Sequence, residues 1–264
     1  MQPFDMLRGV QVSILSALAI LTFSDFNVRA DANDNLREFA RKQGRTEIVG
    51  LLDKAQVGNP EAQYALGHSL LTGIYGVTDI NLGFEWLEKA ARNGSTGAAA
   101  YLGRLFEYGG SEYGVTVPKD VGRATYWYEK AHESGTRCVA INLANMADNA
   151  KPADHGRATH WFEKCAESGL RTCQESLAYR YLYGRVVRQD YERSLRWLLE
   201  AVKPPDESGS PQRLRRLQAL IGLQFENGLG TLKNVAKAIE WYRLAAENGD
   251  KYASYALGRM YEVG

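Results

Sequence analysis

The sixteen residues from Asn234 to Gly249, NVAKAIEWYRLAAENG, decide the fold, because nearly the same arrangement recurs elsewhere in the chain. The segment from Asp120 to Gly135, for example, reads DVGRATYWYEKAHESG. Both segments begin with a side chain that accepts hydrogen bonds from the first turn of a helix. Both end in glycine, the residue that most readily takes the left-handed conformation at a helix end. Each segment therefore predicts one short helix.

Five copies of this segment are marked by the tryptophans of the chain, which recur roughly every 40 residues. A capping residue precedes each tryptophan by seven positions. The pairs are Asp79 with Trp86, Asp120 with Trp127, Asp154 with Trp161, Asp190 with Trp197, and Asn234 with Trp241. Small residues three positions before and four after each tryptophan give the helix a stripe that a neighbouring helix can approach closely.

A second motif precedes each copy and predicts a further helix. It consists of a small residue followed by Leu-Gly, as at Ala98, Leu102 and Gly103. Glycine inside a helix costs about 1 kcal/mol relative to alanine, so its recurrence indicates that helices pack closely there. Since one such pair of helices cannot bury its apolar face alone, the copies are expected to stack into an all-α array.

The combined pattern, A-x-x-x-L-G-x-x-Y-x-x-G, then Asp, then A-x-x-W-Y-x-K-A-A-x-x-G, resembles the Sel-one-like repeat, a longer relative of the tetratricopeptide repeat. The resemblance covers residues 58–264, with five full copies and a truncated sixth. Copy three departs from it, because Ala144 and Ala150 replace two of the glycines. The resemblance implies a right-handed α-solenoid of helix-turn-helix repeats, with the first helix of each repeat on a concave surface.

The chain ahead of the repeats divides into two predicted parts. Residues 1–32 are expected to be a signal peptide, because Gly9–Ser24 is uncharged and Ala30 and Ala32 form an A-x-A pattern. The alternative is a buried first helix. Residues 33–57 are expected to form a helical cap that resembles part of an ankyrin repeat. A signal peptide would make the protein exported, to a periplasm, a lumen or the medium; otherwise it would be cytoplasmic.

Two irregular segments interrupt the repeats. Copy two has extra residues in the loop Gly109–Lys119, and a Pro-, Gly- and Ser-rich linker is expected at 203–211. The sequence stops at Gly264, the turn glycine of the sixth copy. We expect either that the sequence is a fragment of a longer protein or that residues 250–264 support end-to-end self-association.

Charge and hydropathy exclude some classes of partner. The chain has 32 Lys and Arg against 31 Asp and Glu, a net charge of +1. The protein therefore has no overall positive charge that would attract nucleic acid, and we expect no nucleic-acid partner. The uncharged stretch is shorter than the roughly 20 residues of a membrane-spanning helix, so no stable span is expected. Arginines cluster between Arg180 and Arg216, either as solvated helix faces balanced by acids or as a patch for an acidic partner.

Cys165 and Cys173 occupy the small-residue columns where the second helix of one repeat meets the first helix of the next. Equivalent positions elsewhere are pairs such as Ala245 and Ala253. Two small residues there imply close β-carbons, as a disulfide requires. The resemblance to the Sel-one-like repeat also implies a bridge, because secreted cysteine-rich members of that family have one at this junction. The alternative is two free cysteines in the core. Cys138 is expected to be a free thiol.

Catalytic and metal-binding motifs are missing from the sequence. It has no S-x-x-K, H-E-x-x-H or G-x-S-x-G motif and no phosphate-binding loop with Lys-Ser/Thr. We therefore expect a non-catalytic scaffold without metal or cofactor. The alternative, implied by the cysteine-rich relatives, is a weak β-lactamase-type enzyme.

A protein or peptide ligand is the expected partner. Equivalent positions on the first helices point away from the packing column and differ in chemistry from copy to copy, as a dedicated binding surface would. These candidate positions are His68, Arg104, Asn145, Tyr179 and Arg259.

Overall fold

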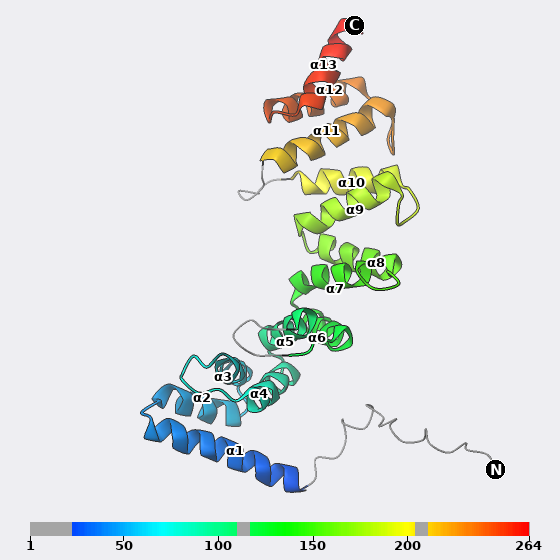
Figure 1. Ribbon diagram of the computed structural model, residues 1–264. Coiled ribbons are helices and arrows are strands. Elements are labelled where there is room, and N and C mark those ends of the chain that lie inside the picture. Colours follow the sequence, from blue (N-terminus) through cyan, green and yellow to red (C-terminus); the bar gives the residue numbers. More distant parts are fainter. Residues whose placement is uncertain (1–22, 110–116, 204–210, 264) are drawn as a thin grey trace, which may run out of the picture. The chain divides into compact units, whose positions relative to one another are not determined.

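A computed structural model describes residues 23–109, 117–203 and 211–263 (Figure 1). Over these residues the chain has thirteen α-helices, a short 3-10 helix and no strand, which confirms the all-α fold. The chain divides into two units, one up to Trp86 and one from Leu87 onward. Each unit is described by itself.

Helix pairs follow the predicted repeats in order. The first helices of the five full repeats are α3 (Pro60–Thr72), α5 (Thr96–Tyr108), α7 (Ala140–Asp148), α9 (Arg171–Tyr183) and α11 (Pro211–Asn227). The second helices are α4 (Ile80–Arg92), α6 (Val121–Glu133), α8 (His155–Glu167), α10 (Tyr191–Ala201) and α12 (Val235–Glu247). Helix α13 (Lys251–Val263) is the first helix of the sixth copy, and the 3-10 helix η2 (Arg137–Val139) precedes α7.

The predicted capping residues begin the second helices. The Asp120 carboxylate accepts a hydrogen bond of 2.9 Å from the backbone N–H of Arg123. The other four capping side chains each accept the equivalent bond from the backbone N–H three residues later. They are Asp79, Asp154, Asp190 and Asn234. Each bond satisfies a backbone donor that the helix itself leaves free, so the local sequence sets these helix starts.

Glycines at the predicted stop positions have positive φ angles. They are Gly73, Gly109, Gly184 and Gly228 after first helices, and Gly94, Gly135, Gly169 and Gly249 after second helices. Gly264 lies outside the described residues. Because side chains with a β-carbon rarely adopt this conformation, these glycines confirm the predicted helix ends.

The amino-terminal unit places two helices before the first repeat. Helices α1 (Phe23–Lys42) and α2 (Thr46–Gln56) lie in the region predicted as signal and cap. Leu36, Ile48 and Leu52 are buried in one cluster with Leu66 of α3. Residues 1–22, which contain most of the predicted signal peptide, lie outside the described residues, while Ala30 and Ala32 are part of α1.

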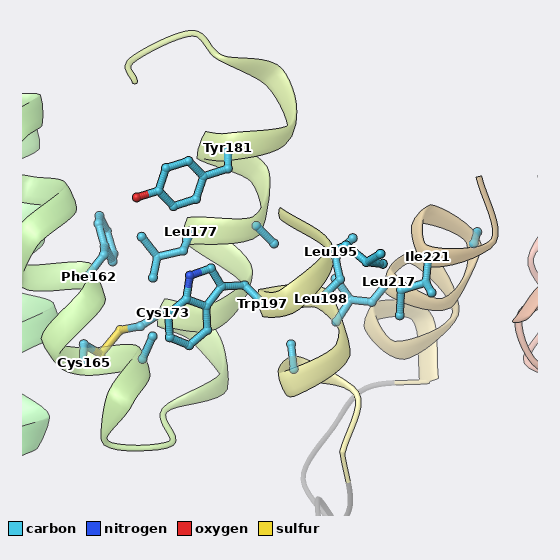
Figure 2. Packing of buried hydrophobic residues seen from close by; sticks show 14 of the residues in the cluster. Phe162, Cys165, Cys173, Leu177, Tyr181, Leu195, Trp197, Leu198, Leu217 and Ile221 are labelled. Carbon is cyan, nitrogen blue, oxygen red and sulfur yellow. A yellow bond between two sulfur atoms is a disulfide. The ribbon is translucent and has the colours of Figure 1, made fainter. Parts of the chain in front are cut away.

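In the second unit, a continuous apolar core connects successive repeats. Leu177 of α9, Leu198 of α10 and Leu217 and Ile221 of α11 are almost fully buried in one cluster (Figure 2). The cluster therefore joins the helices on both sides of the predicted linker. Residues 204–210 of that linker, and residues 110–116 of the predicted long loop, lie outside the described residues.

The Leu-Gly glycines have a more specific role than general close packing. A β-carbon at Gly222 would lie 2.7 Å from the ring of Tyr242, on the second helix of the same repeat. At Gly258, in the unpaired α13, a β-carbon would meet nothing within 4 Å. The glycine is therefore required where a tyrosine from the partner helix occupies the space.

Candidate functional site

The five candidate partner-binding positions lie on first helices, as the repeat pattern requires. His68 is on α3 in the amino-terminal unit, partly buried, with its ring centroid 6.0 Å from that of Tyr64. The other four are in the second unit, on α5, α7, α9 and α13. Arg104, Asn145 and Arg259 are exposed, and Tyr179 is partly buried.

Helix α5 presents a cation and a phenol to solvent. The Arg104 guanidinium lies 5.5 Å from the ring centroid of Tyr101 on its own helix. Tyr108, one turn further on, is 66% exposed. The neighbouring carboxylate of Glu107 raises the pKa of the Tyr108 phenol. The phenol is therefore neutral at physiological pH.

Glu107 ties together three helices behind this face. Its Oε2 accepts a 2.7 Å hydrogen bond from the hydroxyl of Tyr128 on α6 and a 3.3 Å bond from Nδ2 of Asn142 on α7. Burial, and then the bond to Glu107, raises the pKa of Tyr128. This arrangement fixes α5 against α6 and α7, which carry the neighbouring repeat surfaces.

The same tyrosine–glutamate pair recurs in repeat five and includes a candidate residue. The hydroxyl of Tyr242 donates a 2.7 Å bond to Oε2 of Glu226, and Arg259 of α13 forms an ion pair with Oε1 of the same carboxylate. Burial, and then the bond to Glu226, raises the pKa of Tyr242. Arg259 therefore has an internal carboxylate partner as well as an exposed side chain.

Helix α9 carries a row of aromatic and charged side chains. The rings of Tyr179 and Tyr183 are stacked, with centroids 6.2 Å apart and an interplanar angle of 10°. The Arg185 guanidinium lies 5.5 Å from the Tyr183 ring centroid, and Arg216 of α11 is an exposed cation near Tyr179. Burial is the main cause that raises the pKa of Tyr179, and the charge of Glu175 adds to it.

Glu175 and Arg213 complete this row. They form an ion pair between α9 and α11, and Nη2 of Arg213 lies 3.4 Å from the Thr172 hydroxyl. We name the α9 ladder as the six residues Glu175, Tyr179, Tyr183, Arg185, Arg213 and Arg216. The sequence pointed to Tyr179 and, through the arginine cluster, to the three arginines, but not to Glu175 and Tyr183. The spacing of four residues from Glu175 to Tyr179 and on to Tyr183 is the signal that could have revealed these two.

Repeat three replaces the tyrosine–glutamate pair with a charged network. Phe162 takes the place of the tyrosine, and Arg180 lies with its guanidinium 4.6 Å from the Phe162 ring centroid. Arg180, whose side chain is only 11% exposed, forms an ion pair with Asp148. Nδ1 of His155 lies 3.0 Å from the other oxygen of that carboxylate. Arg180 therefore contributes to the stability of the fold and is not part of the exposed surface.

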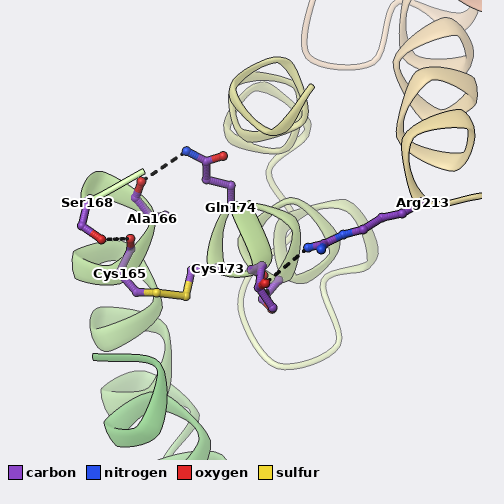
Figure 3. The surroundings of a disulfide bond; sticks show 8 residues. Cys165, Ala166, Ser168, Cys173, Gln174 and Arg213 are labelled. Carbon is purple, nitrogen blue, oxygen red and sulfur yellow. Dashed lines mark hydrogen bonds between the residues drawn. A yellow bond between two sulfur atoms is a disulfide. The ribbon is translucent and has the colours of Figure 1, made fainter. Parts of the chain in front are cut away.

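The predicted disulfide joins α8 to the first turn of α9 (Figure 3). Cys165 and Cys173 are bonded, with their Cα atoms 5.8 Å apart and both residues fully buried. Beside the bridge, Nε2 of Gln174 donates a 3.3 Å hydrogen bond to the carbonyl oxygen of Ala166. Cys138 is exposed and free, as predicted. The bridge thus fixes the start of α9 against the preceding repeat.

Across the described part of the chain, no group of three or more His, Cys, Asp or Glu side chains is placed to hold a metal ion. Of the helices in this part, none combines the length and the apolar character needed to cross a membrane.

The fold and these surfaces define the class: an array of helix-turn-helix repeats of the α-solenoid type. The family model for the Sel1 repeat matches residues 60–95, 96–135, 140–170, 172–203 and 218–250. This chain belongs to the Sel1 repeat family. The five matched segments coincide with the five predicted copies.

Solved structures of two bacterial proteins are similar to this one. A protective antigen of uropathogenic Escherichia coli strains, which displays an SLR fold, is 26% identical with a TM-score of 0.50, over 81% of this chain and 44% of that one. A Sel1 repeat protein from Oxalobacter formigenes is 24% identical with a TM-score of 0.51, over 81% of this chain and 59% of its own. The chain therefore spans less than two thirds of either relative. No curated protein matches.

Proposed function

We propose that this protein is a non-catalytic scaffold that binds a protein or peptide partner through the exposed face of its first helices. One observation carries the proposal. Arg104, Asn145, Tyr179 and Arg259 occupy one register position on the first helices α5, α7, α9 and α13 and differ in chemistry, whereas the buried columns of the same helices repeat. Proteins of the Sel1 repeat family are typically protein-interaction scaffolds.

The side chains on this face are of the kinds that dominate protein recognition. Tyrosine and arginine are enriched among residues that contribute most to binding. Tyrosine supplies a large, rigid contact area, and asparagine supplies adaptable hydrogen bonds. Tyr108 and Tyr183, which share one repeat position, are 66% and 53% exposed, and Tyr255 on α13 is 71% exposed. Large, exposed aromatic rings on these helices favour a polypeptide partner over a small molecule.

Internal contacts hold this face in place before a partner arrives. Glu107 links α5 to α6 and α7, and Glu226 links α11 to α12 and α13. A surface that is already ordered loses less conformational entropy on binding. His68, in the amino-terminal unit, is proposed as a separate contact on the equivalent face of α3.

Export is part of the proposal and is supported by the bridge between Cys165 and Cys173. Structural disulfides persist in oxidising compartments and are rare in a reducing cytosol. Sequencing the amino terminus of the mature protein tests this part. A start near residue 33 supports export, and an intact Met1 in the functional protein contradicts it.

Selection from a displayed library of random peptides tests the scaffold function. We expect enriched peptides that bind the intact protein and lose at least about tenfold in affinity, or about 1.4 kcal/mol, with Arg104→Ala or Tyr179→Ala. Tyr126→Ala on α6 and Arg196→Ala on α10 are matched controls, because both side chains are exposed on second helices. Equal losses in the control variants would contradict the proposed surface.

The non-catalytic part of the proposal has its own measurement. A scaffold hydrolyses a chromogenic cephalosporin no faster than buffer at any protein concentration. A hydrolysis rate that rises in proportion to the amount of folded protein would instead favour the β-lactamase-type alternative.

A further inference from the structure

The α9 ladder is a local patch of positive charge on a protein that is otherwise nearly neutral. It contains three arginines, Arg185, Arg213 and Arg216, against the single carboxylate of Glu175. That carboxylate forms an ion pair with Arg213. The charges of Arg185 and Arg216 are therefore not balanced within the ladder.

The remaining two arginines lie near aromatic rings rather than acids. The Arg185 guanidinium lies over the ring of Tyr183, and Arg216 is an exposed cation near Tyr179. In the part of the chain that the structure describes, neither guanidinium is within ion-pair distance of a carboxylate. Both side chains are exposed, so their N–H donors are accessible to an external acceptor.

Only some of the other arginines in this region have acidic partners. Arg193 lies 3.4 Å from Asp190, and the largely buried Arg180 is paired with Asp148. Arg196 instead lies over the ring of Trp197 on its own helix, and Arg215 donates to the carbonyl oxygen of Gly249. The expectation of solvated faces balanced by acids therefore holds for Arg193. It does not describe Arg185 and Arg216.

We infer that the α9 ladder is a docking surface for an acidic peptide segment of a partner protein, with carboxylates bound by Arg185 and Arg216 and an apolar side chain packed on Tyr183. This inference rests on the proposed scaffold function and specifies its partner. A guanidinium binds a carboxylate through two parallel hydrogen bonds, which gives both strength and orientation. The exposed ring of Tyr183, over which Arg185 lies, supplies the apolar contact.

An acidic peptide fits this surface better than a nucleic acid does. Binding to nucleic acid depends on many phosphate contacts made by Lys and Arg along a surface. The ladder offers two unbalanced cations beside a carboxylate, and the whole chain has a net charge of only +1. Exposed cations beside stacked aromatic rings match a short segment that carries both acidic and apolar side chains.

Fluorescence anisotropy with defined peptides tests the inference. The probe is a labelled peptide of alternating Glu and Tyr, and the comparison probe has Gln in place of Glu. We expect the acidic peptide to bind and the Gln peptide to bind at least about tenfold more weakly, the ratio that corresponds to about 1.4 kcal/mol. Because exposed charges are screened by salt, the affinity for the acidic peptide should also fall as NaCl is raised.

Variants of the full chain locate the binding site. Arg185→Gln and Arg216→Gln should each weaken binding of the acidic peptide severalfold, while the matched Arg196→Gln on α10 should leave it unchanged. Unchanged circular dichroism and melting of the variants would show that the ladder, not the fold, was altered. Equal binding of both peptides, tighter binding of a labelled single-stranded DNA, or no effect of the two ladder variants would overturn the inference.

The peptide selection described above separates this inference from the scaffold function. Selected peptides that lose affinity with Arg104→Ala but not with Arg216→Gln, and that are not enriched in acidic residues, would overturn the ladder inference and leave the scaffold function intact. A selection that yields no binding peptide at all would contradict both.

Discussion

Gly103 lies directly against the ring of Tyr128, so that a β-carbon at residue 103 would be only 2.6 Å from Cδ1 of the tyrosine. The hydroxyl of the same tyrosine donates to Glu107, one helical turn after the glycine. Glycine, tyrosine and glutamate thus form one unit that joins the two helices of a repeat. Repeat five has the same unit at Gly222, Tyr242 and Glu226.

Gly103→Ala is expected to destabilise the protein by about 1–3 kcal/mol, the usual cost of overpacking a filled core. The gain in helix propensity, about 1 kcal/mol, offsets part of this cost. Gly258→Ala is the matched control, because it has the same position in α13 with nothing within 4 Å. Gly258→Ala should be neutral or stabilising. Urea unfolding followed by circular dichroism measures both, and equal effects would contradict the role of Tyr128.

Tyr128→Phe is expected to lower stability at neutral pH by about 1–2 kcal/mol, because it removes a hydrogen bond to a carboxylate. The effect depends on pH. Burial, and then Glu107, raises the pKa of Tyr128 in the folded state, whereas the phenol of the unfolded chain ionises near pH 10. The stability that Tyr128 contributes is therefore complete below about pH 10 and is lost as the pH rises above it.

Unfolding free energies of wild type and Tyr128→Phe, measured from pH 8 to 11, check this pH dependence. Above about pH 10 the wild type should lose up to about 1.4 kcal/mol per pH unit more than the variant. The difference between the two proteins should therefore narrow. A constant difference across this range would show that Tyr128 ionises equally in the folded and unfolded chain.

Removing the bridge with Cys165→Ala and Cys173→Ala together should cost about 2.5 kcal/mol, the chain-entropy value for so short a loop. The double variant is a suitable test because Ala245 and Ala253 occupy the same columns in the last repeats. Its core is therefore expected to pack normally. A melting temperature lower by roughly 5–10 °C would agree with this value. A melting temperature equal to that of the oxidised wild type would contradict a stabilising bridge.

Thiol labelling under native, non-reducing conditions should modify Cys138 alone. Its side chain is exposed, whereas Cys165 and Cys173 are bonded and buried. Mass spectrometry should then find one label before, and three labels after, unfolding with a reductant. Three labels in the unfolded, unreduced protein would exclude the bridge.

Arg180→Ala should destabilise the protein by about 2 kcal/mol or more, because it leaves the partly buried carboxylate of Asp148 without its guanidinium partner. Arg157→Ala is the control. It breaks an ion pair with Glu129 whose two side chains are 47% and 37% exposed, and such surface pairs contribute at most about 1 kcal/mol. Chemical unfolding of both variants measures the two losses in the free energy of unfolding. Equal losses for Arg157→Ala and Arg180→Ala would contradict a larger contribution from the partly buried pair.

Helix boundaries and the repeat were determined by the sequence alone. Asp120 must accept from the backbone three residues later, and Gly135 must adopt a positive φ, whatever the rest of the chain does. These requirements act over one helical turn, so they recur in every copy and can be read directly. The small-residue columns likewise predicted the meeting of Cys165 and Cys173, because the junction repeats eight residues apart.

Tertiary structure alone decided which side chains share a partner. Glu107 binds Tyr128 and Asn142, which are 21 and 35 residues away in sequence. In repeat three, Phe162 stands in place of the tyrosine and has no hydroxyl, so the equivalent carboxylate, Asp148, pairs with Arg180 instead. Likewise, Arg213 pairs with Glu175 because this part of α11 lies beside α9. Such choices depend on the relative positions of several helices at once, so a pattern along one helix could locate a binding face but not its charge.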